Sequence, residues 1–172
     1  IGDGERSFEG DGGPAIDARV DLAVAVTFSP DHSALYLVDQ ASQRVRRVSD
    51  GADGTIETVA GTGETDCGAT ETGKDAACIG DGGPAIDAKL HFPLGQSPIA
   101  GGKLAFDGEG RLLIADNAHH RIRRVDHDGL ITTIAGTGEP GSSGEGVPAT
   151  EAEFNRPSDL AVDPEGRIFV AD

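Results

Sequence analysis

The sequence predicts an all-β fold, a β-propeller of four-stranded antiparallel blades, because a long unit recurs in tandem and each unit contains short apolar runs. The octapeptide Asp-Gly-Gly-Pro-Ala-Ile-Asp-Ala at 11–18 recurs letter for letter at 81–88 and loosely at 145–152. Ala-Gly-Thr-Gly-Glu occurs at 60–64 and 135–139, and an Arg-rich run occurs at 44–48 and 121–125. Self-similarity at a long period is typical of repeat architectures.

Each unit offers four runs of strand length. They lie at 24–28, 34–38, 44–48 and 55–60 in the first unit, and at 103–106, 111–115, 121–125 and 130–135 in the second. These runs are rich in Val, Ile and Leu and are bounded by Gly, Pro, Asp or Asn, a pattern that indicates strands joined by turns. Four such antiparallel strands make one propeller blade. Between units, Pro84 to Leu90 predicts a short helical turn, with Asp81, like Asp11, capping its start.

The unit boundaries divide the chain into three parts. We expect one partial propeller over 1–172: a blade with a preceding tail at 1–64, a blade with Cys-containing and Gly-rich insertions at 65–139, and the start of a third blade at 140–172. The insertions fall at 65–80 and around 95–102, as surface loops allow. A propeller needs about four to eight blades to close. We therefore expect a segment of a longer chain, or closure by self-association.

The charge of the chain restricts the class of partner. Its net charge of −16 argues against nucleic acid, whose binding rests on Lys and Arg neutralising phosphates. Anionic lipid is disfavoured for the same reason, and no apolar run reaches the roughly 18 residues that would predict a membrane span. The partners expected are a protein, a glycan or a second copy of this chain.

Both cysteines, Cys67 and Cys78, lie in the insertion at 65–80. A disulfide that closes this loop is the first interpretation, and it would place the protein in an oxidising compartment. The rival interpretation is a metal or redox pair, which lacks the four ligands of a structural zinc site.

Several of these segments, read in order, resemble a known repeat. The runs at 112–126 and 160–172, and the joint at 131–139, resemble the NHL repeat, in the long subtype of bacterial secreted and teneurin-like proteins. The resemblance implies a propeller, commonly six-bladed, that serves as an interaction or adhesion platform at the cell surface, outside the cell or in the periplasm. The sequence departs from the pattern where Ser29 replaces the Asp of the third unit, where His119 replaces the usual Asn, and where Gln43 replaces the usual His.

Candidate chemistry is sparse. The neighbours His119 and His120 suggest a metal, but adjacent side chains on an extended strand point to opposite faces, so a turn role is favoured. The Asp-Gly-Gly-Pro motifs suggest calcium, yet they offer too few oxygen ligands. The strand-end residues Asp39 and Asp116, which Asp172 repeats, are expected to pair with Arg47 and Arg124.

No catalytic, cofactor-binding or metal residue is assigned. A Gly-x-Ser-x-Gly elbow is absent from the sequence, and the Gly-Thr-Gly motifs lack the Lys of a phosphate loop. The function expected is a non-enzymatic scaffold or a module that binds protein or carbohydrate. The alternative is a propeller lyase or hydrolase with a metal in its central channel, to which His91 or Asn117 would contribute.

Overall fold

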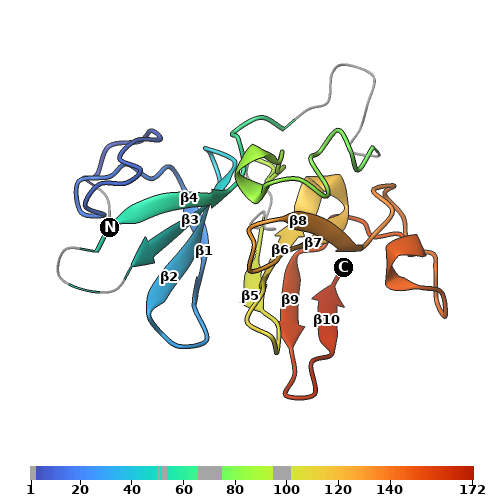
Figure 1. Ribbon diagram of the computed structural model, residues 1–172. Helices are drawn as coiled ribbons and strands as arrows, with labels where there is room; N and C mark the ends of the chain where they lie inside the picture. Colours follow the sequence, from blue (N-terminus) through green and yellow to red (C-terminus); the bar gives the residue numbers. More distant parts are fainter. Residues whose placement is uncertain (1–2, 50, 52–53, 66–74, 95–101) are drawn as a thin grey trace.

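The chain forms three antiparallel sheets that stand side by side like the blades of a fan (Figure 1). The computed structural model describes residues 3–49, 51, 54–65, 75–94 and 102–172. The first sheet has the order β1-β2-β3-β4 and the second β5-β6-β7-β8, and β9 pairs with β10 in the third. The strands are β1 (Ala23–Phe28), β2 (Ala34–Asp39), β3 (Arg44–Ser49), β4 (Ile56–Ala60), β5 (Leu104–Phe106), β6 (Leu112–Asp116), β7 (Arg121–Val125), β8 (Ile131–Ala135), β9 (Asp159–Val162) and β10 (Ile168–Ala171).

The predicted strands are confirmed to within about a residue at each end. Within each sheet, strands that are consecutive in sequence pair with each other in antiparallel fashion, so every sheet is a simple meander. The described helices are single 3-10 turns: η1 (Ala85–Asp87), η2 (Asn117–His119) and η3 (Ala149–Glu151). None of the helices in the described ranges is long and apolar enough to cross a membrane. The all-β prediction of four-stranded propeller blades is therefore correct.

The Asp-Gly-Gly-Pro motif covers the outer edge of the fourth strand of its own blade. Gly12 donates its amide to the carbonyl of Ile56 at 2.7 Å, and Gly82 donates to Ile131 at 2.7 Å. Pro14 and Pro84 form single bridges with Thr55 and Leu130. An uncovered sheet edge invites pairing with other chains, and this segment blocks it.

The expected helical turn forms after Pro84, but the capping role predicted for Asp81 is wrong. No side chain caps η1. The carboxylate of Asp81 instead binds Arg123 at 2.7 Å, and that of Asp11 binds Arg46 at 2.7 Å. The physical reason is that these arginines are buried, so an unpaired guanidinium there would cost more than an uncapped single turn.

The hydrophobic core lies between the blades. Val38 and Val45 of the first blade share a cluster with Leu104 and Ile114 of the second, and Leu90 and Phe92 from the linker complete it. Leu113 and Ile122 of the second blade pack in the same way on Leu160 of the third. Val, Leu, Ile and Ala make up most of these interfaces, with Phe92 as the aromatic residue fully buried in the first one.

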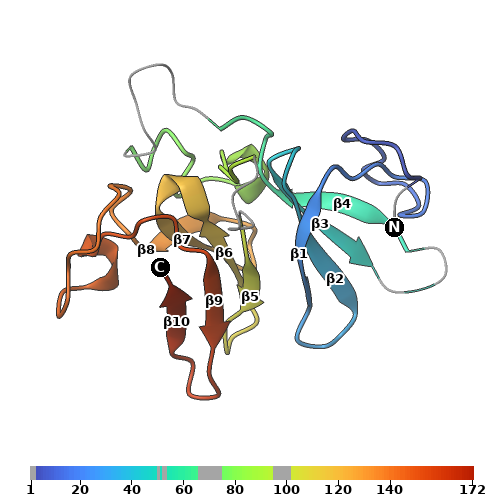
Figure 2. The same cartoon turned by 180° about the vertical axis from the view of Figure 1, so that it is seen from behind.

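One repeat position shows that a side chain is buried only where a neighbouring blade covers it. Leu104 and Leu160, on β5 and β9, are 8% and 7% exposed because each packs on the preceding blade. Val26 holds the same place on β1, where it is 64% exposed. β1 lies beside the second sheet (Figure 2), but Val26 pairs with Leu37, whose side chain packs with Ile56 on the other face of the first sheet. Burial at this position is therefore made by contact between blades.

Candidate binding groove between the first two blades

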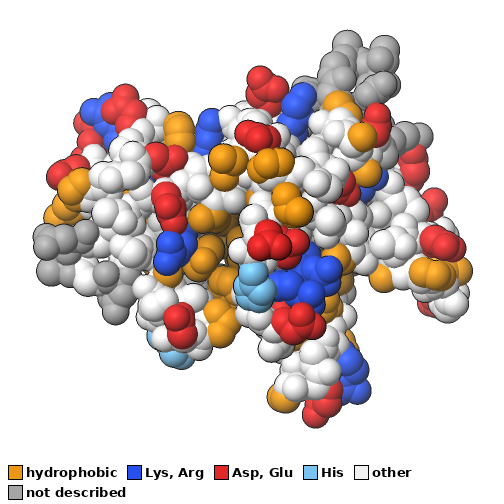
Figure 3. Space-filling view, in the orientation of Figure 1, with side chains coloured by type: hydrophobic (Ala, Val, Ile, Leu, Met, Phe, Trp, Pro, Cys, Tyr) orange, Lys and Arg blue, Asp and Glu red, His pale blue; other side chains and the backbone are white. Residues whose placement is uncertain are grey.

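A groove of about 520 Å³ lies between the two complete blades. β2, β3 and β4 form one wall, and β5, β6 and the β7–β8 turn form the other, while η1 lies along it. Figure 3 shows this hollow near the middle of the molecule, with a hydrophobic floor and charged side chains on both rims. Ligand sites commonly have about 300–1,000 Å³ and an apolar lining with a few polar groups, so its size and chemistry fit a binding site.

The first wall follows from strand register. Tyr36 pairs with Arg47 across β2 and β3, and Arg47 pairs with Glu57 across β3 and β4. Directly paired residues point to the same face of a sheet, so these three side chains form one row. Arg47 donates to Glu57 at 2.7 Å, and both side chains are partly exposed. Within this row, the positive charge of Arg47 is therefore balanced by the negative charge of Glu57.

The floor is aromatic. Tyr36 of the first blade and Phe106 of the second meet edge to face, with ring centroids 5.0 Å apart and an interplanar angle of 80°. Such a contact is one of the preferred geometries for aromatic pairs. Burial raises the pKa of the Tyr36 hydroxyl, so it stays a neutral hydrogen-bonding group. The hydrogen bond to Glu57 likewise raises the pKa of Arg47.

The second wall is the turn from Asp126 to Gly129. Asp126 Oδ1 accepts the amides of Asp128 at 3.0 Å and of Leu130 at 2.9 Å, which fixes the turn. The ring of His127 contacts the Glu109 carbonyl at 3.0 Å. Asp128 is exposed at the rim. The groove is thus lined by strands of two blades and by a short turn that its own hydrogen bonds hold in place.

A second polar cluster lies at the other end of the strands and is repeated in each blade. The carboxylate of Asp39 accepts the amide of Asp21 at 3.0 Å, that of Asp116 accepts His91 at 2.8 Å, and that of Asp172 accepts Asn155 at 2.7 Å. Each bond is made to the segment that precedes the first strand of the same blade. The strand-end aspartates hold the blade closed at this end.

The arginine partners predicted for these aspartates were wrong by one residue. Arg46 contacts Asp39, and Arg123 contacts Asp116, both at 3.5 Å and with fully buried side chains. Arg47 turns to the opposite face of the sheet, where it binds Glu57, and Arg124 occupies the equivalent place on β7. Register shifts at Val45/Arg46 and Ile122/Arg123 accompany the buried arginines. The extra residues of these bulges are Val59 on β4 and Ile134 on β8, whereas β3 and β7 alternate regularly and so point neighbouring arginines to opposite faces.

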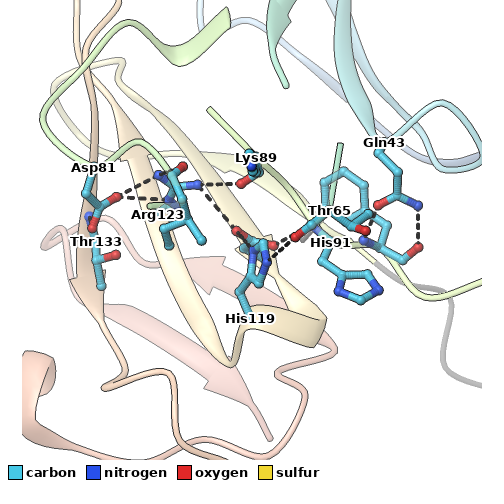
Figure 4. Close-up of polar contacts among 11 residues, drawn as sticks. Gln43, Thr65, Asp81, Lys89, His91, His119, Arg123 and Thr133 are labelled. Carbon is cyan, nitrogen blue, oxygen red and sulfur yellow. Dashed lines mark hydrogen bonds and ion pairs between the residues drawn. The ribbon is translucent and has the colours of Figure 1, made fainter. Parts of the chain in front are cut away.

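Each buried arginine also binds the linker that precedes its blade. Arg123 contacts Asp81 at 2.7 Å and donates to the carbonyls of Lys89 at 2.9 Å and Ile79 at 3.2 Å (Figure 4). Arg46 does the same with Asp11 and with the carbonyls of Glu9 and Arg19. The guanidinium thus joins strand, strand end and linker, a role that suits its fixed fan of donors.

The two neighbouring histidines diverge, but for a different reason from the one expected. His119 ends η2 and His120 follows in the left-handed conformation at φ +55°, so neither lies on an extended strand. His119 is buried, with Nδ1 2.9 Å from Asp116 and Nε2 3.0 Å from the Thr65 carbonyl. His120 Nδ1 accepts the amide of Arg156 in the next blade. Both rings are used as ties between segments.

Gln43 takes the place of His120 in the first blade, as the sequence indicated. It also has φ +55°, and its amide group both accepts from and donates to the backbone of Phe92. Asn117 Nδ2 donates to the carbonyls of Arg156 and Pro157 in the next blade. The corner after each second strand therefore connects one blade to the next.

The remaining candidates have simple places. His91 packs edge to face on His119, with ring centroids 5.6 Å apart. Within the described part of the chain, no three His, Cys, Asp or Glu side chains are grouped so as to hold a metal ion. Cys67 and the insertion at 95–101 lie outside the described residues, so the pairing of Cys67 with Cys78 stays a prediction.

Comparison with known proteins identifies the repeat. A family model for the NHL repeat matches residues 154–172. Teneurin-m of Drosophila melanogaster is 32% identical over 157 residues, which cover 85% of this chain and 5% of the relative. NHL repeat-containing protein 2 of Gallus gallus is 34% identical over 144 residues, which cover 81% and 18%.

The chain contains an NHL repeat. The resemblance drawn from its motifs is confirmed, although the chain spans only a small fraction of either relative. Among solved structures, an auxiliary nutrient binding protein from Bacteroides thetaiotaomicron VPI-5482 superposes with a TM-score of 0.60 at 23% identity. The superposition covers 84% of the NHL-repeat chain and 33% of that protein. At this identity the likeness concerns the fold, a β-propeller.

The groove residues were missed at the level of sequence. Tyr36 is the only tyrosine of the chain, and it precedes a repeated apolar position, but its contact with Phe106 joins residues of different blades. One available signal was the sequence difference at this position, because the second and third blades carry Leu113 and Phe169 there. Tyr36 is the only residue with a hydroxyl group at this repeat position, and that difference pointed to a site specific to the first blade.

Proposed function

We propose that this chain is a non-enzymatic NHL β-propeller module of a larger secreted or surface protein, and that the groove between its first two blades binds a protein or glycan partner. The observation that carries the proposal is the groove itself, whose aromatic floor and charged rims come from two complete blades. At the other end of the strands, interblade hydrogen bonds such as Phe92 to Gln43 fix the two blades to each other. A preformed site of this kind avoids the entropic cost of ordering a loop on binding.

Two further expectations belong to this proposal. A Cys67–Cys78 disulfide and a location outside the cell, at its surface or in the periplasm fit the resemblance to teneurin-like proteins. We expect the module to act without a cofactor. A six-bladed closed propeller, completed by other residues of the protein or by a second copy, would cover the apolar side chains that β1 and β10 expose.

The repeat itself supplies a matched pair of variants for a test. Ile86 lines the groove and is 54% exposed, and Ile16 is its counterpart in the identical octapeptide, away from the groove and 71% exposed. Because both side chains are largely solvated, Ile86→Ser and Ile16→Ser should both fold.

The test is a selection for binders on the purified protein. A displayed library of random peptides and a glycan array are screened against the wild type, Ile86→Ser and Ile16→Ser. We expect ligands that bind the wild type and Ile16→Ser but lose about fivefold or more in affinity for Ile86→Ser, the scale of losing one apolar contact of ~1 kcal/mol. The proposal fails if no ligand emerges, or if those that emerge bind Ile86→Ser as well as they bind Ile16→Ser.

A further inference from the structure

We propose that the groove between the first two blades takes a peptide segment in which a lysine or arginine is flanked by aliphatic residues. This inference rests on the proposed function and names the chemistry of its ligand. It follows from three properties of the groove: the charge that remains on its rims, its aromatic floor, and its size. No ligand of this kind follows from the NHL resemblance.

The rims carry unbalanced negative charge. Arg47 and Glu57 neutralise each other at 2.7 Å on the first wall. On the second wall stand Asp126 and Asp128, and among the described residues neither forms an ion pair with a cation. The whole chain has a net charge of −16, so the surrounding field has the same sign. A cationic group is therefore favoured in the groove, and an anionic one is repelled.

The floor suits the stem and the head of a basic side chain. Phe106 and Tyr36 are only partly buried, so ring surface remains accessible beside their mutual contact. A guanidinium or ammonium over such a ring gains about 0.5–1 kcal/mol at an exposed site. The methylene stem can lie along Val59 and Ile86, as long basic side chains commonly do on apolar surface.

The size limits the occupant to a short segment. About 520 Å³ holds a few side chains and cannot hold a folded domain. A neutral sugar could stack on the same rings, but it would leave the two aspartates without a countercharge. Charge complementarity thus favours a basic peptide over a glycan, and the experiment can separate them.

The experiment is an NMR titration of the ¹⁵N-labelled chain with three short probes. They are the capped pentapeptide Gly-Leu-Lys-Leu-Gly, the same peptide with glutamate in place of lysine, and the neutral disaccharide maltose. We expect the lysine peptide to shift the amides of η1 and of residues 126–129, with an affinity at least about fivefold above that of the glutamate peptide. Raising the salt concentration from about 0.05 to 0.5 M should weaken it, because exposed charges are screened.

Two charge variants complete the test. Asp128→Asn should weaken the lysine peptide by about two- to fivefold, the range of one exposed ion pair. Asp17→Asn, which removes the same charge away from the groove, should leave the affinity unchanged. Equal binding of the lysine and glutamate peptides, or no effect of Asp128→Asn, would overturn the inference.

The outcomes also separate this inference from the proposed function. If maltose or the glutamate peptide shifts the groove amides while the lysine peptide does not, the inference is wrong and the groove still binds. If the lysine peptide shifts amides only elsewhere, the inference is wrong as well. If no probe shifts the groove and the library selection is also empty, both proposals fail.

Discussion

His119 and Ser42 occupy the same position in successive blades, and the difference changes the electrostatics of the strand-end aspartates. Burial raises the pKa of Asp39, which has Ser42 beside it. Burial acts on Asp116 in the same direction, but the charge and hydrogen bond of His119, with Arg123, outweigh it and lower the pKa of that carboxyl. The pKa values of the two strand-end aspartates are thus shifted in opposite directions, and His119 is one cause of the lowering at Asp116.

The geometry around His119 favours the doubly protonated ring. Nδ1 faces a carboxylate oxygen of Asp116 and Nε2 faces the Thr65 carbonyl, and both are acceptors. A neutral imidazole has only one N–H, so one of these contacts would be lost. Burial alone would lower the pKa of His119, but Asp116 and the Thr65 carbonyl together raise it, against an opposing effect of Arg123.

We predict that His119 makes the stability of the chain depend on pH. Since its pKa is higher in the folded than in the unfolded state, its contribution is complete below about pH 6.5 and is lost as pH rises through the folded value. The free energy of unfolding should fall over that range by at most ~1.4 kcal/mol per pH unit. Urea unfolding between pH 6 and 9, with an NMR titration of the ring, measures this.

The variants for this prediction come from the chain itself. His119→Ser introduces the residue that the first blade has at this position, and it should remove the pH dependence of the free energy of unfolding. His32→Asn, at an exposed turn, should leave that pH dependence unchanged. His91 and His120 also lie near His119, and burial lowers the pKa of His120, so its effect has the opposite sign. A pH dependence that survives in His119→Ser would contradict the assignment.

At the scale of the element, the linker is tied to its blade by a buried arginine. Arg46 binds Asp11 in the linker and contacts Asp39 at the end of β2, and Arg123 repeats this with Asp81 and Asp116. Each linker also adds backbone hydrogen bonds along the outer strand. The Asp-Gly-Gly-Pro segments at 11–14 and 81–84 are therefore attached to the edge of the sheet.

We predict that Arg46→Leu destabilises the chain by about 3–5 kcal/mol, because it leaves the buried carboxylate of Asp39 without its cation. Arg47→Leu, one residue further on, should cost less than about 1 kcal/mol, since its pair with Glu57 is exposed to solvent. Chemical denaturation of the two variants measures the difference. Similar losses for both would contradict the partner assignment made from the structure.

At the scale of the whole molecule, stability depends on blades that cover one another. Leu104 packs between the first two blades, and Val26 holds the same repeat position on a face that no described residue covers. The same feature explains why large apolar side chains such as Phe28 and Phe169 are exposed, on β1 and β10. Burial in this architecture belongs to pairs of neighbouring sheets.

We predict that Leu104→Ala costs about 2–5 kcal/mol, the range for a leucine truncated in a packed core. Val26→Ala should change the free energy of unfolding of this chain by no more than about 0.5 kcal/mol, as expected of an exposed site. Thermal or urea unfolding of both variants tests the contrast. If the Val26 variant lost as much stability as the Leu104 variant, its face would have to be covered in solution, for instance by a second copy.

The sequence by itself determined the repeat, the strands and their turns, because local signals suffice for these. Alternating apolar runs and Gly, Pro and Asp at their ends act within a few residues, and letter-for-letter copies place the units. It also indicated that Gln43 stands for a histidine, and that the strand-end aspartates have structural partners. These predictions needed no knowledge of contacts between distant segments.

The tertiary structure alone decided which arginine is buried, what Asp11 and Asp81 bind, and where the groove lies. Alternation along β3 points Arg46 and Arg47 to opposite faces, but only the packing of the segment around Asp11 on one face decides that Arg46 is the buried one. The groove joins Tyr36 of one blade to Phe106 of the next, 70 positions further along the chain. Contacts between residues so far apart in the sequence depend on how the blades pack against each other. A local sequence pattern does not contain that information.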